Sequence, residues 1–171
     1  MPAQYHIPRR LEGSFPDGIE LVIETAVQDG RLVGIESKWG NRLAVLKTYQ
    51  FEGGMPGFMA GHIQIAERPR DKERWFNNIY FEAEFEYMEG ELVKVGGKDP
   101  ITRYYMSTIK KTDTGVPSRI SGEISYCPTD VDISYYKDGR VKEVVVLMRG
   151  STLKLKPSGP EPRHHTISLP H

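Results

Sequence analysis

The sequence predicts an all-β protein that folds as a single-domain antiparallel barrel of about ten strands. Apolar and polar residues alternate over many short segments, and turn signals that contain glycine separate these segments at nearly regular intervals. The length of 171 residues fits one domain. Sequential hairpins favour an up-and-down meander, and closing a meander removes its exposed edges. A β-sandwich is the alternative that the same pattern allows.

Both ends of the chain are rich in proline and are expected to lie outside the barrel domain, which we place at residues 17–157. Residues 1–16 contain three prolines and are predicted to form an extended arm. Residues 158–171 are predicted to form a proline-rich tail. Since Ile167 and Leu169 alternate, this tail could add a strand to the sheet edge of a neighbouring subunit.

The first two strands are predicted at residues 19–27 and 31–38, joined by a Gln28-Asp29-Gly30 turn. A third strand is predicted at 41–51. One of its faces carries Leu43, Val45, Lys47, Tyr49 and Phe51. If this face points inwards, burial would depress the pKa of the lysine towards a catalytic range, whereas a lysine at a strand end would extend into solvent.

The next segment, FEGGMPGFMAGHIQ at residues 51–64, combines four glycines and a proline with apolar side chains. The glycines and the proline predict a loop at 53–61. Met55, Phe58 and Met59 would then plug one end of the barrel, form a mobile lid over a lumen, or stand exposed for another chain to cover.

At most one short helix is expected, near residues 70–77, anchored by Trp75 and Phe76. It is followed by the clearest strand of the sequence, at 79–87, in which an apolar face alternates with glutamates. Hairpin signals then separate further strands at residues 104–110, 119–126, 131–136, 141–148 and 152–156.

Composition narrows the function. The 23 basic and 23 acidic residues cancel, so the electrostatic attraction that dominates nucleic-acid binding is missing. No segment has the length and hydropathy of a membrane helix, and the N-terminus lacks a signal-peptide pattern, so we expect a cytoplasmic protein. We expect no metal ion and no cofactor, because Cys-x-x-Cys, His-Glu-x-x-His and glycine-rich phosphate motifs are absent.

One segment resembles a known family. In residues 128–136, Thr129-Asp130 precede Tyr135-Tyr136 in a way similar to the Thr-Asp-x-x-x-Tyr signature of lipocalins, and Arg149 resembles their later arginine. The Gly-x-Trp motif and the C-terminal helix pattern of lipocalins are absent. The resemblance therefore implies that a calycin-like barrel is compatible with the chain, and it assigns no family.

The first functional hypothesis is a barrel that encloses an apolar or aromatic small molecule. It could act as a cyclase or isomerase through shape and desolvation. Lys47 and His62 are the acid–base candidates for such a reaction. The candidate ligand-binding residues are Trp39, Tyr49, Met55, Phe58, Met59, Tyr105 and Tyr135. The second hypothesis is a non-enzymatic assembly or interaction subunit that forms homo-oligomers through its termini and the 53–61 segment.

Overall fold

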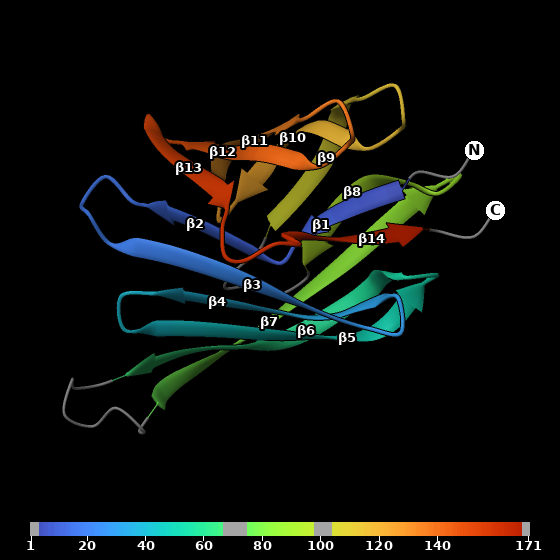
Figure 1. Cartoon of the computed structure of the whole chain (residues 1–171). Coiled ribbons are helices and arrows are strands. Elements are labelled where there is room, and N and C mark those ends of the chain that lie inside the picture. Colours follow the sequence, from blue (N-terminus) through green and yellow to red (C-terminus); the bar gives the residue numbers. More distant parts are fainter. Residues whose placement is uncertain (1–3, 67–74, 98–103, 169–171) are drawn as a thin grey trace.

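The computed structural model describes residues 4–66, 75–97 and 104–168, and these residues form strands and turns without any helix (Figure 1). Twelve of the strands form a closed antiparallel barrel. The prediction of an all-β barrel is therefore confirmed, and the sandwich alternative is excluded. The described residues include no helix with the length and apolar character needed to cross a membrane.

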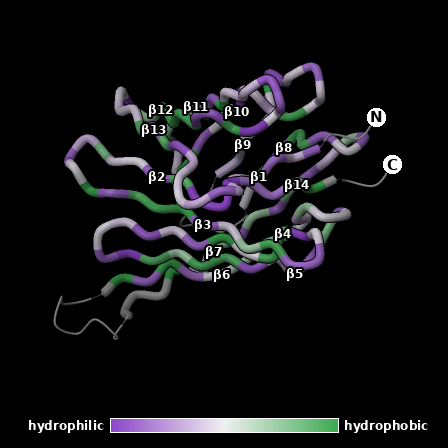
Figure 2. Tube along the Cα trace, viewed as in Figure 1, coloured by the Kyte–Doolittle hydropathy of each residue, from purple (hydrophilic) through white to green (hydrophobic). Residues whose placement is uncertain are grey.

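The barrel follows the chain from one strand to its neighbour, and its last strand pairs with its first through Leu155 and Gly13. Its strands are β2 (Arg10–Ser14), β3 (Glu20–Gln28), β4 (Arg31–Trp39), β5 (Arg42–Glu52), β6 (Met55–Ala66), β7 (Trp75–Met88), β8 (Glu91–Gly97), β9 (Tyr104–Lys111), β10 (Pro117–Ile124), β11 (Cys127–Tyr135), β12 (Val141–Met148) and β13 (Ser151–Pro157). Figure 2 shows hydrophobic and hydrophilic residues interspersed along these strands, as expected for a sheet with an apolar inner face.

The two segments at the chain ends form a separate sheet of two strands, β1 (Gln4–Pro8) and β14 (His164–Ser168). We call it the terminal sheet. Its strands lie between the opposite walls of the barrel, at the end where both termini and the β3–β4 and β5–β6 hairpins are found (Figure 1). Thr25 of the barrel wall holds it there, because its hydroxyl donates to the Pro8 carbonyl at 2.7 Å and its amide donates to Arg9 at 3.0 Å.

Both chain ends, predicted as an extended arm and a proline-rich tail that could add a strand to a neighbouring subunit, contain strands that pair within the same chain. The segment 1–16 divides at Arg9 into β1, which joins the terminal sheet, and β2, which is part of the barrel wall. The segment 158–171 supplies β14, whose partner is the N-terminal strand of the same chain. The pairing becomes favourable because Tyr5 and Ile167, opposite each other in the register, are both buried in the barrel.

The loop predicted at 53–61 is wrong. Only Gly53 and Gly54 form the turn, and β6 begins at Met55. Pro56 is accommodated where the β5–β6 register shifts, which is a position that tolerates a residue without an amide donor. Gly61 is needed because a Cβ at this position would lie 1.7 Å from the Val45 carbonyl oxygen. The glycine signal therefore reflects close contact between strands rather than flexibility.

The helix predicted near 70–77 falls partly outside the described residues. Residues 75–77 belong to β7, so the helical prediction is wrong for them, because pairing with β6 takes precedence over a weak helical pattern. From Ile79 onwards the strand has the predicted faces: Phe81, Ala83 and Phe85 pack in the interior.

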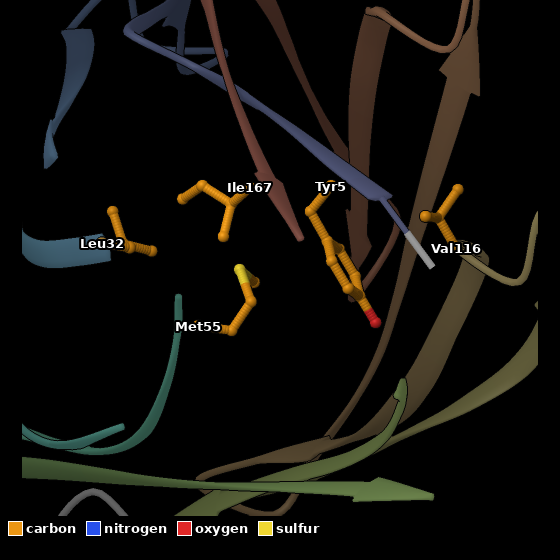
Figure 3. Packing of buried hydrophobic residues seen from close by; sticks show 5 residues of the cluster. All are labelled: Tyr5, Leu32, Met55, Val116 and Ile167. Carbon is orange, nitrogen blue, oxygen red and sulfur yellow. The ribbon is translucent and has the colours of Figure 1, made fainter. Parts of the chain in front are cut away.

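Two apolar clusters occupy the inside of the barrel. We call the first the terminal cluster; it contains Tyr5, Leu32, Met55, Val116 and Ile167. Figure 3 shows these side chains directed towards one another from the terminal sheet and the surrounding wall. We call the second the central cluster; it contains Met59, Ala83, Tyr104 and Met106.

Candidate functional site

An apolar chamber of about 200 Å³ lies between β1 and the barrel wall. β1 of the terminal sheet forms one side of it, and the wall from β10 to β12 forms the opposite side. The side chains along it include Tyr5, Ile7, Leu11, Met55, Leu92, Val116, Ile120, Ile133, Tyr135, Val141 and Val144. A partly open space of this kind, mostly lined by aliphatic and aromatic groups, is a usual form of a small-molecule site.

Tyr5, which is buried, and Tyr87 and Tyr135, which are partly buried, lie at this end of the barrel, and each donates its hydroxyl to a backbone carbonyl. Tyr5 donates to Gly90 at 3.0 Å, Tyr87 to Pro56 at 2.7 Å and Tyr135 to Pro117 at 2.5 Å. The Tyr5 hydroxyl also accepts the Leu92 amide at 2.9 Å. These bonds fasten the terminal sheet and three parts of the wall to one another, and they occupy the phenolic hydrogens that a ligand would otherwise use.

Burial is the largest influence on the acidity of these phenols. It raises the pKa of Tyr5, Tyr87 and Tyr135 above the ordinary value of 10.0 for tyrosine. All three are therefore neutral at physiological pH. A phenol that is neutral and already bonded offers a ligand an apolar ring face rather than an acid or a base, so this end of the chamber favours an apolar molecule.

Several predicted ligand-binding residues lie inside the barrel. Met55 and Tyr135 line the chamber. Met59 is fully buried in the central cluster, and Trp39 is half-buried on β4, opposite Leu21. The structure thus brings Met55 and Tyr135 together at one site. Met59 lies deeper in the barrel, and Trp39 lies near its other end.

The remaining predicted site residues lie on the outer face. Lys47 is exposed, and Tyr49 is 65% exposed, because Leu46 and Thr48 of the same strand point inwards. His62 is also exposed, with its ring 5.7 Å from that of Tyr80. Lys47 and His62 therefore do not reach the chamber.

Phe58 and Tyr105 also lie away from the chamber. Phe58 borders a surface groove together with Glu84 and Glu86, and Tyr105 is half exposed. Both residues have inward-facing neighbours, Met59 and Tyr104, and the alternation of a strand sends adjacent side chains to opposite faces.

Sequence reasoning missed Tyr5, Tyr87 and His6 as site residues. Tyr87 belongs to the alternating face of β7, which was a usable signal, whereas Tyr5 and His6 lie in a segment expected to be an unpaired arm. His6 stands at the rim of the chamber beside Gly139, and its Nδ1 lies 3.2 Å from the Thr166 hydroxyl. In the described ranges no group of three or more His, Cys, Asp and Glu side chains is placed to hold a metal ion.

No protein-family model, no curated protein and no solved structure matches this chain. The class defined by the observations above is a closed β-barrel that carries its own two-stranded terminal sheet inside one end.

Proposed function

We propose that this protein binds an apolar small molecule in the chamber beneath the terminal sheet. The observation that carries the proposal is the combination of a partly open apolar chamber with two lining phenols, Tyr5 and Tyr135, whose hydrogens are committed to the backbone. The volume of about 200 Å³ is roughly seven times the ~30 Å³ that one water molecule occupies in the liquid. A compact aromatic or branched aliphatic ligand suits this volume.

Any reaction in this chamber would depend on shape and desolvation, as in a cyclisation or an isomerisation. Lys47 and His62 lie outside it, and the three phenols are neutral and hydrogen-bonded. His6 at the rim is the one imidazole bordering the chamber among the described residues. The proposal is accordingly one of binding first, with confinement as the source of any rate effect.

The competing hypothesis of an assembly subunit has less support. It relies on the termini and on residues 53–61 as contact surfaces. The structure uses Tyr5, Met55 and Ile167 from these segments in one intramolecular cluster. The same atoms cannot simultaneously be the contact surface for another chain.

Filling the chamber tests the proposal. Val144 lines it, whereas Val145 is the next residue on the same strand and faces outwards opposite Lys154. We expect naphthalene, followed by its fluorescence, to bind at one saturable site in the parent protein. Val144→Phe should abolish this binding, and the matched control Val145→Phe should leave it unchanged. Non-saturable binding, or equal loss in both variants, would show that the chamber is not a ligand site.

A further inference from the structure

A second pocket, distinct from the chamber, lies where the ends of β12 and β13 meet the connection that leads from β13 to β14. Its volume is about 380 Å³. Four cationic side chains border it, Arg140, Lys142, Lys156 and Arg163, and Glu161 is the carboxylate among its lining residues. The chain as a whole has no net charge, so this is a local concentration of positive charge that the composition does not reveal. Figure 1 shows how the connection to β14 leaves the wall at this place.

Within the described ranges, carboxylates lie near three of the four cations and leave the charge of Lys142 uncompensated; the first is Asp138, 2.7 Å from Nε of Arg140. Glu161 lies 3.8 Å from Arg163, and Glu143 lies 3.9 Å from Lys156. Ion pairs at distances near 4 Å between largely solvated side chains contribute little to stability. Lys142 has the ring of Tyr136, 5.9 Å away, as its neighbour, with no carboxylate in ion-pair range among the described residues.

Both arginines are held by their Nε atoms. Nε of Arg140 donates to Asp138 at 2.7 Å, and Nε of Arg163 donates to the Gly159 carbonyl at 3.0 Å. Anchoring at Nε fixes each guanidinium and leaves its terminal NH₂ groups for another acceptor. Two oriented guanidiniums are well suited to oxygens of a tetrahedral anion, because each presents a planar pair of donors.

His164 supplies an independent observation at the same place. Its Nε2 accepts the Val141 amide at 3.2 Å, so in the neutral ring the proton is on Nδ1. This Nδ1 is buried and has no hydrogen-bond partner in the described part of the chain. Burial, together with the positive charge of Arg140 and His6, lowers the pKa of His164 and keeps the ring neutral. A buried donor without an acceptor, on a residue that lines a cationic pocket, is the kind of group that an ordered water or a bound anion completes.

From these contacts we infer that the pocket binds the phosphate group of a small soluble molecule. A single carboxylate presents two oxygens to the four cationic side chains, whereas a diphosphate has enough oxygens to bridge several of them. The concave shape and the short span of the pocket suit a compact anion. The inference does not depend on the chamber, because the two sites use different side chains for recognition.

Titration of the parent protein with inorganic pyrophosphate at low ionic strength, followed by calorimetry, tests this site. We expect one saturable site. Arg163→Gln should weaken it by about tenfold or more, the loss expected for a charged hydrogen bond. Arg163→Lys should weaken it less, since the charge remains. The ¹⁵N shift of His164 should change on binding.

Lys154→Gln is the matched control. Lys154 is exposed on β13 and does not border the pocket, so its loss removes the same charge but should leave affinity unchanged. Equal weakening by Lys154→Gln and Arg163→Gln would reduce the binding to general charge attraction and overturn the site. The site would also be overturned if Arg163→Gln kept both its fold, as judged by circular dichroism, and its affinity for pyrophosphate. Binding to vesicles of phosphatidic acid that pyrophosphate does not displace would overturn the soluble source of the phosphate.

Discussion

The terminal cluster and the central cluster are both apolar, but the chain assembles them differently. The central cluster joins the paired strands β6 and β7 to β9 of the same wall, and the rings of Phe81 and Tyr104 stack there with centroids 5.2 Å apart. The terminal cluster joins the two ends of the chain to the wall, with Tyr5 and Ile167 docked inside. A cluster within the wall can be lost only by opening the barrel. The terminal cluster can be lost by undocking two short strands.

The central cluster should therefore give the largest stability change. Met59 is fully buried, and Met59→Ala removes contacts that the closed wall cannot replace. We expect the free energy of unfolding to fall by about 3 kcal/mol, as is common for such truncations. Denaturant unfolding measures this change, with Met88→Ala as the control because Met88 is 68% exposed. Equal effects of the two substitutions would contradict the claim that the packing of Met59 in the central cluster stabilises the barrel.

Truncation in the terminal cluster should cost less and act locally. We expect Ile167→Ala to lower stability by roughly 2 kcal/mol, since undocking of the terminal sheet limits the loss. Hydrogen exchange should accelerate in β1 and β14 while the amides beside Met59 keep their protection. Uniform acceleration throughout the barrel would show that the two clusters unfold as one unit.

The difference between the wall strands and the docked chain ends explains which parts of the fold can be predicted from the sequence. The faces of β7 follow from alternation, because glutamates on one side leave no ambiguity about the other. The inner and outer faces of β5 cannot be assigned from alternation in this way. Val45 and Tyr49 lie on the outer face, whereas the smaller Ala44 and Thr48 lie on the inner face. In a wide barrel the inner residue need not be the larger one, so size misled the placement of Lys47.

The candidate site was less predictable than the wall. Met55 and Tyr135 were identified, but the chamber owes its cover to the terminal sheet. The strands β1 and β14 are five residues each, and neither would be stable alone. Their pairing brings Tyr5 next to Ile167 across almost the whole chain, and no local pattern encodes a contact of that range.

Alkaline pH should weaken the barrel through phenols at both clusters, because burial also raises the pKa of Tyr104 in the central cluster, and Tyr87 and Tyr135 carry the effect at the terminal end. Burial raises the pKa of Tyr87 and Tyr135 in the folded state above the unfolded value near 10.0, so their contribution is fully present below that pH and is lost as pH rises beyond it. The slope should stay below about 1.4 kcal/mol per pH unit for each group, because a phenol differs by at most one bound proton between the folded and unfolded states. Denaturant unfolding between pH 8 and about pH 11 measures it. Tyr135→Phe should flatten the curve, and Tyr49→Phe, at an exposed site, should not.

Mild acid should give the smallest effect, confined to the terminal sheet. Burial is the largest cause of the lowered pKa of both His164 and His165, with Arg140 and His6 adding to it for the first and Arg9 for the second. Their folded pKa lies below the unfolded value near 6.5, so the stability they contribute is present above that pH and is lost as pH falls. Asp138 opposes the change at His164 without reversing it.

We expect the methyl resonances of Ile167 to shift and broaden between pH 7 and about pH 5.5, while the methyl resonance of Met59 stays constant. His164→Gln removes one of the two titrating rings and should reduce the change at Ile167. Because this substitution keeps a polar side chain, it also separates titration from the loss of packing. A parallel shift at Met59 would mean that protonation reaches the central cluster, and the separation of the two ends of the barrel would then be wrong.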